Sequence, residues 1–321
     1  MELSVSEFKS FLISLELDAK NGSTSNELYN RLKGILGNIK RLDYFLDPGK
    51  RLYRARFVDS IEDYKSIENI SYPKPEFVRK HGRANLPHEP IFYASDSPVG
   101  PFFELNKLEP GKLVALSSWE TSQVLPSHLI PFSSELVVSP DGALSDQTLV
   151  DEKSEIFDDW VCKIFTESVK LDEIHKYVLT STVADIFLKF ELNLKGPFGV
   201  PLVGSYTPES SPSISFPSLA IFENAWTNYA IHTAFVDDYL RFRSCDILQI
   251  DAIRESSITF TMLDHSTSIE FDQTLKWNKS PARLRSDKNS YNGGPITVSF
   301  DDADWSTRNE DGCIVYFDHW N

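Results

Sequence analysis

An α+β fold is predicted by the amino-acid sequence, because segments with the period of amphipathic helices are combined with short segments that have strand character. The helical pattern occupies the first forty residues and returns between residues 152 and 192. Short apolar stretches separated by turn signals fill most of the remainder. With 321 residues, 41% of them hydrophobic, the chain is long enough for one large domain or for a domain with substantial additions.

Two amphipathic helices are expected in the first forty residues. Ser4 with Glu7 forms a capping-box pattern ahead of apolar residues spaced on one face, and Thr24 with Glu27 repeats that pattern. Because both helices are amphipathic, we expect the pair to lie against the main domain. The alternative is an arm that binds a partner.

The rest of the chain predicts strands, further helices and one long loop. Strands are expected at 52–57, 91–94, 113–119, 214–216, 246–250, 258–262, 269–271, 296–300 and 313–317. Ser97-Pro98 is typical of a helix start, with serine as the N-cap and proline as the first helical residue. Residues 196–213 are rich in proline, glycine and serine, which indicates a loop.

Composition and charge exclude several classes of protein. The formal net charge of −15 opposes binding to a nucleic-acid backbone, which needs clustered lysine and arginine. No apolar run approaches the roughly 20 residues that span a bilayer, and the N-terminus lacks the pattern of a secretory signal. The three cysteines lie far apart, which fits a reducing cytosol better than a disulfide framework. We therefore expect a cytoplasmic protein that binds neither nucleic acid nor membranes.

Common signatures of phosphate loops, dinucleotide-binding folds, zinc proteases and serine hydrolases are absent from the sequence. The seven histidines are scattered, and no two stand at metal-ligand spacing on an expected element. His81 and His88 flank Arg83, but a structural role is the better interpretation of each. We expect no metal site.

Four segments carry polar residues that are informative in combination. The first is Leu52-Tyr53-Arg54-Ala55-Arg56, and the second is Gly82-Arg83-Ala84-Asn85 with Tyr93 ten residues after its arginine. The third is Glu104, eleven residues beyond Tyr93. The fourth is Ser215-Phe216-Pro217-Ser218, followed by Asn228-Tyr229-Ala230-Ile231.

In order and spacing these segments resemble the RES domain, the toxin half of a class of bacterial toxin–antitoxin pairs. That family typically shows Tyr-Arg on a strand, Gly-Arg-x-Asn, Leu-Tyr-x-Ala/Ser, a helical Glu, and later Tyr-Pro-Ser with Asn-x-Ala. The resemblance covers about residues 50–250. This chain departs from it at Phe216, at Phe102-Phe103 and across 86–90, where the family usually has tyrosine, small residues, and glycine and proline respectively. The departures leave the polar residues in place.

The resemblance implies a fold like that of the mono-ADP-ribosyltransferases, with a split β-sheet core and flanking helices. It divides the chain into an N-terminal helical extension (1–45), an RES-like NAD-binding domain (46–255) and a β-rich C-terminal extension (256–321) packed on the core. It also implies NAD as the substrate, and a cognate antitoxin that occludes the site as a partner.

The residue types at the implied site suit NAD chemistry. Arginine binds diphosphate oxygens in bidentate fashion, so Arg54 and Arg83 are the candidates for that role. Arg56 is the alternative if the other face of its strand lies in the site. Tyr93 would stack on the cationic nicotinamide ring, and Glu104 would stabilise the oxocarbenium-like state in which the glycosidic bond breaks.

Two further residues take supporting roles. Ser218 would hydrogen-bond the nicotinamide amide or the ribose and orient Glu104, and Asn228 would hold the loop. The predicted function is cleavage of the nicotinamide–ribose bond of NAD, by a glycohydrolase or a phosphorylase. The alternatives are a protein ADP-ribosyltransferase and a non-catalytic module that keeps the scaffold for binding or regulation. A toxin acting on RNA is disfavoured by the acidic charge.

Overall fold

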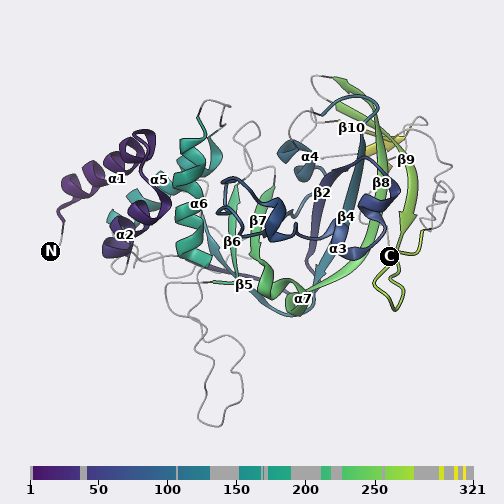
Figure 1. The fold of residues 1–321 in the computed structure, drawn as a ribbon, viewed down its shortest axis with the longest axis horizontal. Coiled ribbons are helices and arrows are strands. Elements are labelled where there is room, and N and C mark those ends of the chain that lie inside the picture. The colour runs from purple at the N-terminus through teal and green to yellow at the C-terminus, as the bar shows by residue number, and fades with distance from the viewer. Residues whose placement is uncertain are drawn as a thin grey trace, which may run out of the picture. The chain divides into compact units, whose positions relative to one another are not determined.

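A computed structural model of the chain describes residues 3–36, 42–105, 108–130, 152–167, 169, 173–188, 211–217, 226–254, 257–277, 296–299, 307–309 and 314–315. These residues form a mixed α+β structure, as the sequence predicts (Figure 1). They group into two compact units. Unit 1 comprises Met1–Asp47, Pro73–Tyr93 and Gln123–Tyr239, and unit 2 comprises Pro48–Tyr72, Ala94–Ser122 and Leu240–Asn321. The division at residues 45 and 255 stays a prediction.

Four helices dominate unit 1, namely α1 (Val5–Lys20), α2 (Ser25–Leu36), α5 (Glu152–Thr166) and α6 (His175–Leu188). The helical pair at the N-terminus is confirmed, and each helix begins at its expected cap. Ser4 Oγ accepts a hydrogen bond from the Glu7 N–H at 3.3 Å, and the Glu7 carboxylate accepts from the Ser4 N–H at 2.8 Å. Thr24 and Glu27 make the same reciprocal pair before α2.

The core of unit 1 is built from the inward faces of these helices. Phe8, Leu12 and Leu15 of α1 are buried in one cluster with apolar residues of α2, α5, α6 and the strands β3, β6 and β7. Trp160 of α5 belongs to the same cluster and donates its indole N–H to Glu16 of α1 at 2.9 Å. The helical pair therefore lies against the rest of unit 1, which confirms the first of the two interpretations of its amphipathic pattern.

The sheet of unit 1 has the strand order β1-β5-β6-β7. Its strands are β1 (Leu42–Leu46), β5 (Leu125–Leu129), β6 (Ser213–Pro217) and β7 (Thr227–His232); β5 and β6 are parallel and the other neighbours antiparallel. Short helical turns complete the unit: η2 (Pro75–Phe77), η4 (Thr233–Phe235) and α7 (Val236–Tyr239). The boundary between the units falls within β3 (Ile91–Ser95).

Unit 2 is an antiparallel sheet in which β2, β4, β8, β9, β10, β11 and β12 follow one another as neighbours. Their bounds are β2 (Arg51–Val58), β4 (Leu113–Thr121), β8 (Leu240–Arg254), β9 (Ser257–Ser266), β10 (Ile296–Ser299), β11 (Thr307–Asn309) and β12 (Ile314–Val315). The helical segments of this unit are η1 (Ile61–Tyr64), α3 (Ile67–Ile70) and α4 (Gly100–Glu104).

Both faces of the unit 2 sheet are covered by apolar side chains. Val114 and Leu116 of β4 pack in one cluster with Phe102 of α4, whereas Ala115 packs in another with Ile70 of α3. Successive residues of a strand point to opposite faces, so this alternation shows a sheet buried on two sides.

Two local predictions are wrong. The helix after Ser97-Pro98 begins at Gly100, because Ser97 Oγ instead accepts a hydrogen bond from the Val99 N–H and holds a turn there. Residues 269–271 are not a strand: the Glu270 N–H donates to the Thr274 carbonyl at 2.8 Å, and Asp272 accepts from Thr274. This turn leaves only an isolated bridge between Ile269 and Leu275.

We predict that Leu12→Ala lowers the free energy of unfolding by about 2–5 kcal/mol, because it opens a cavity in the unit 1 core. The neighbouring Ile13→Ala should change it by no more than about 0.5 kcal/mol, since the Ile13 side chain is 59% exposed. Urea unfolding followed by circular dichroism measures both. Equal losses for the two variants would contradict the assignment of the inward face of α1.

Candidate functional site

The Gly82–Asn85 segment forms a tight loop. Gly82 and Asn85, the first and last residues of the Gly-Arg-Ala-Asn motif, contact each other in it. The Gly82 N–H donates to the Asn85 carbonyl at 3.0 Å, and the Asn85 side-chain amide donates to the carbonyls of Lys80 and Leu86 at 3.2 and 3.3 Å. A Cβ atom on residue 82 would overlap Oδ1 of Asn85. Glycine and asparagine at this spacing therefore serve the shape of the loop.

His81 anchors the start of this loop to α6. Its Nδ1 lies 2.9 Å from Ser181 Oγ, and that hydroxyl donates to the Tyr177 carbonyl at 2.5 Å. Because the serine proton is used, His81 Nδ1–H is the donor between them. Burial lowers the pKa of His81, so the ring is neutral and structural at pH 7.

Arg83 caps the C-terminal end of α5. Its Nη1 donates to the carbonyls of Phe165 and Glu167, the latter at 3.4 Å. Carbonyls at a helix C-terminus lack partners within the helix and attract a cation. Both contacts use one nitrogen of the guanidinium, which has five N–H donors in all.

Tyr93 joins the strand β3 to the same loop, because its hydroxyl accepts a hydrogen bond from the Ala84 N–H. Its half-buried ring packs against the unit 1 core. The structure thus brings together the Gly-Arg-Ala-Asn segment and the tyrosine that follows it, two parts of the predicted site. Stacking of Tyr93 on nicotinamide stays a prediction.

A cavity of about 360 Å³ lies beside this loop, entirely within unit 1. Loop residues, the end of α6 and the turn after β7 line it: Ala84, Asn85, Leu86, His88, Glu89, Pro90, Ile91, Asp185, Leu188, His232, Thr233, Ala234 and Phe235. The volume falls in the range of small-molecule sites, roughly 300–1,000 Å³. We call this cavity the loop cavity.

His232 and Asp185 both line the loop cavity and interact electrostatically. Burial lowers the pKa of His232, and the charge of Asp185 opposes that shift. His232 Nδ1 accepts from the Ala234 N–H at 3.2 Å, so in the neutral ring Nε2 carries the proton. Imidazole, carboxylate and amide side chains are thus among the groups that line the cavity, those of His232, Asp185 and Asn85. Neither His232 nor Asp185 could be recognised from the sequence, because they lie on separate elements, β7 and α6.

The fourth motif falls on the antiparallel pair β6–β7. Phe216 lies opposite Asn228 in the strand register, and both are buried. The Phe216 ring lies 5.4 Å from that of Phe165, so phenylalanine at this position serves the core. Ser218 lies outside the described residues.

Arg54 and Arg56 belong to unit 2 and bind main-chain carbonyls at the end of α3. Arg54 Nε donates to the Ser71 carbonyl at 2.8 Å, and Arg56 Nη1 donates to that of Asn69. Burial lowers the pKa of Arg56, opposed by the charge of Asp63. Residues two apart on a strand share a face, so the expectation that strand orientation would choose between Arg54 and Arg56 is wrong.

Glu104 is the last residue of α4 in unit 2, and it is exposed. The helix is held by Phe102, which is buried against Phe260 with 4.6 Å between the ring centroids. Glu104 thus lies at the exposed end of a short helix that Phe102 holds against the core. Its proposed role at ribose stays a prediction.

The sequence does not reveal one buried hydrogen-bonded pair in unit 2. Asp246 of β8 and His265 of β9 are direct partners in the register, and His265 Nδ1 lies 2.5 Å from Asp246 Oδ1. Both side chains are almost fully buried. Burial raises the pKa of Asp246 to about 6, although the bond and charge of His265 lower it. The contact depends on the register of β8 with β9, which the sequence alone does not show.

Among the described residues, no group of three or more histidine, cysteine, aspartate or glutamate side chains is placed to hold a metal ion. Within the same ranges, no helix has both the length and the apolar character that crossing a bilayer requires. Comparison of the chain with protein-family models, curated proteins and solved structures finds no match.

We predict that Tyr93→Phe destabilises the loop by about 1–3 kcal/mol, because the buried Ala84 N–H loses its acceptor. Amide hydrogen exchange at Ala84 should accelerate, and urea unfolding should show the loss. Tyr177→Phe is the matched control, since Tyr177 is also half-buried and its hydroxyl makes no hydrogen bond to the described residues. Unchanged exchange at Ala84 would argue against the Tyr93 contact.

We also predict a pH-dependent difference in stability between the wild type and Asp246→Asn. A carboxyl whose pKa is raised on folding contributes stability below its ordinary pKa and loses it as pH rises through the folded value. The wild type should therefore lose about 1–3 kcal/mol relative to the variant between pH 4 and 7. Urea unfolding across that range tests this, and a difference independent of pH would count against it.

Proposed function

We propose that the protein cleaves the bond between nicotinamide and ribose in NAD. The observation that carries the proposal is the hydrogen bond between the Tyr93 hydroxyl and the Ala84 N–H. It joins two of the four motif segments beside a cavity of suitable size. The order of the motifs supplies the remaining support, together with the RES-like, mono-ADP-ribosyltransferase-like core that it implies.

In the proposed reaction the C1′–N bond of NAD breaks and its electron pair passes to the nicotinamide nitrogen, which becomes neutral. The oxygen of water or phosphate then bonds to C1′, and in hydrolysis the water proton is released. Glu104 would stabilise the positive charge that develops on the ribose, because a carboxylate there favours the transition state over the ground state. Ser218 and Asn228 keep the supporting roles that the motifs predict.

Arg83 supports the proposal in one respect. Its contacts with α5 use Nη1 alone among the described residues, so Nε and Nη2 keep donors for a diphosphate oxygen. Arg54 and Arg56 keep their proposed roles on the motif order. Free NAD is the proposed target of the activity, and an antitoxin protein that covers the site is the proposed partner.

A second candidate function is a non-catalytic module that binds or regulates through the same scaffold. One specific observation favours it. Each of the three arginines assigned to the diphosphate already donates to main-chain carbonyls of its own unit, so their presence is accounted for by structure alone. Such a module would bind a nucleotide without turning it over.

The test is incubation of the purified full-length protein with NAD, with and without phosphate, and separation of nicotinamide and ADP-ribose products by chromatography. We expect nicotinamide release that Glu104→Gln lowers about 100-fold or more. Glu109→Gln is the matched control, because Glu109 is an exposed carboxylate paired with Lys112 nearby in sequence. Formation of ADP-ribose carrying a phosphate at C1′ of the former nicotinamide ribose, in the presence of phosphate, would identify a phosphorylase.

The same samples separate the two functions. Absence of product with a rise in melting temperature on adding NAD would support the binding module. Absence of both, or release that survives Glu104→Gln, would contradict the proposed enzyme.

A further inference from the structure

One side of α1 presents a continuous strip to the surface. Lys9, Ile13, Leu17 and Lys20 are all exposed, and Ile13 and Leu17 are 59% and 53% exposed. At about 100° per residue these four positions fall within an arc of about 80°. The strip thus has two apolar side chains at its centre and a lysine at each end, over about 16 Å of helix.

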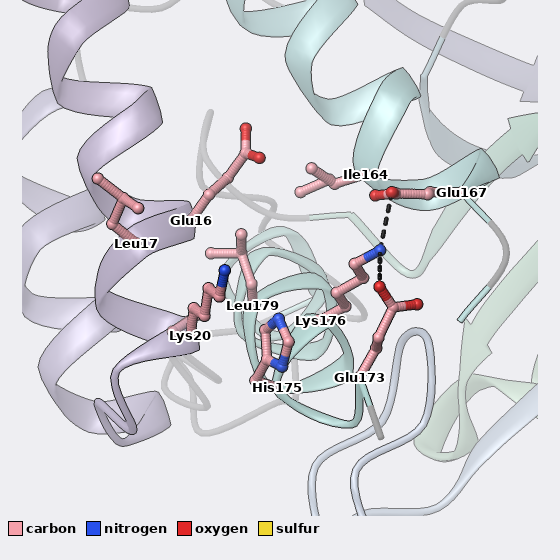
Figure 2. Close-up of a pocket in the computed structure, with 10 residues that line it drawn as sticks. Glu16, Leu17, Lys20, Ile164, Glu167, Glu173, His175, Lys176 and Leu179 are labelled. Atoms are coloured by element: carbon pink, nitrogen blue, oxygen red, sulfur yellow. Dashed lines mark hydrogen bonds and ion pairs between the residues drawn. The ribbon is translucent and has the colours of Figure 1, made fainter. Parts of the chain in front are cut away.

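A groove adjoins this strip, between the end of α1 and the beginning of α6 (Figure 2). Its volume is about 310 Å³, and Leu17, Ala19, Ile164 and Leu179 supply its apolar lining. The side chain of Leu17 therefore belongs to both the strip and the groove. Ile174, immediately before α6, adds a further exposed apolar side chain.

The acidic groups that line the groove are already paired. Lys176 lies 2.8 Å from Glu167 and 2.9 Å from Glu173. Glu16 accepts hydrogen bonds from Trp160 at 2.9 Å and from Lys163 at 3.3 Å.

In contrast, Lys9 and Lys20 make no ion pair with any described residue. The unmatched charge of the strip is therefore positive, in a chain whose net charge is −15.

We propose that the strip and groove of α1 bind an amphipathic segment of a partner protein. In that segment apolar side chains lie between acidic residues about three helical turns apart, and one apolar side chain enters the groove. The two lysines would pair with the acidic residues, and Ile13 and Leu17 would be buried. This inference is independent of the proposed NAD chemistry.

Other occupants fit the surface less well. A second copy would bring like-charged strips together, since both ends of the strip are lysine, and the two chains would repel through their acidic charge. An anionic membrane would be repelled by the same net charge, and its flat surface would leave the groove empty. A protein segment satisfies the apolar centre, the lysines and the groove together.

The experiment is selection of a displayed library of random 16-residue peptides on the full-length protein, with counter-selection on Ile13→Ser/Leu17→Ser. We expect enriched peptides that carry apolar residues flanked by Asp or Glu. A synthetic version of an enriched peptide should bind about tenfold or more weakly to Leu17→Ser and to Lys9→Glu/Lys20→Glu in fluorescence anisotropy. Replacing its acidic residues by lysine should restore binding to the latter variant.

Phe77→Ser and Lys33→Glu are the controls. The first changes an exposed aromatic side chain of unit 1, and the second an exposed lysine on α2, and neither residue belongs to the strip. They should leave peptide affinity unchanged. Failure to enrich peptides, or enriched peptides that ignore Leu17→Ser, would overturn the proposal. Binding to phosphatidylserine vesicles that is lost in Leu17→Ser would also overturn it, in favour of a membrane surface.

Discussion

The burial of apolar side chains from α1, α5, α6 and β6 against one another is the constraint on which unit 1 depends. Phe165 shows how the polar residues follow from it. Its ring packs on Phe216 in that core, and its carbonyl is the group that Arg83 caps. The loop that carries Arg83 is thus positioned by the end of a helix whose own place is set by apolar packing. Polar contacts here refine an arrangement that hydrophobic burial establishes.

Local signals in the sequence account for the parts of the fold that were predicted. The caps at Ser4 and Thr24 depend on residues three positions away, so the pattern alone locates both helices. Strands β1 and β5 were not predicted, and the partners that pair with them are distant in sequence. Strand β7 was also not predicted, although its partner β6 is close in the chain. The predicted strand at 269–271 was apolar enough, but the Asp272–Thr274 contact closes a turn instead.

The candidate site divides in the same way. The motif order placed Gly82–Asn85 and Tyr93 in one predicted site, but the bond between the Ala84 N–H and the Tyr93 hydroxyl that joins them is visible only in the structure. The hydrogen-bond acceptors of the three arginines Arg54, Arg56 and Arg83 could not be predicted. They are main-chain carbonyls of other segments, and the sequence pattern of side chains carries no information about them. An arginine in a motif is therefore compatible with two physical roles, capping a helix end and binding phosphate. The five N–H donors of one guanidinium are enough for both.

The order of chain segments in the two units has a practical consequence. The chain changes from one unit to the other five times, so neither unit corresponds to a continuous gene fragment. A truncation from the N-terminus that passes residue 47, or from the C-terminus that passes residue 240, removes strands or helices from both units, and the remainder keeps apolar surface that has lost its cover. Insertion of a tag or a protease site at an exposed turn, such as that at Gly22, preserves every segment. Because segments of the two units alternate along the chain, each unit is better studied by substitutions at its surface than by truncation.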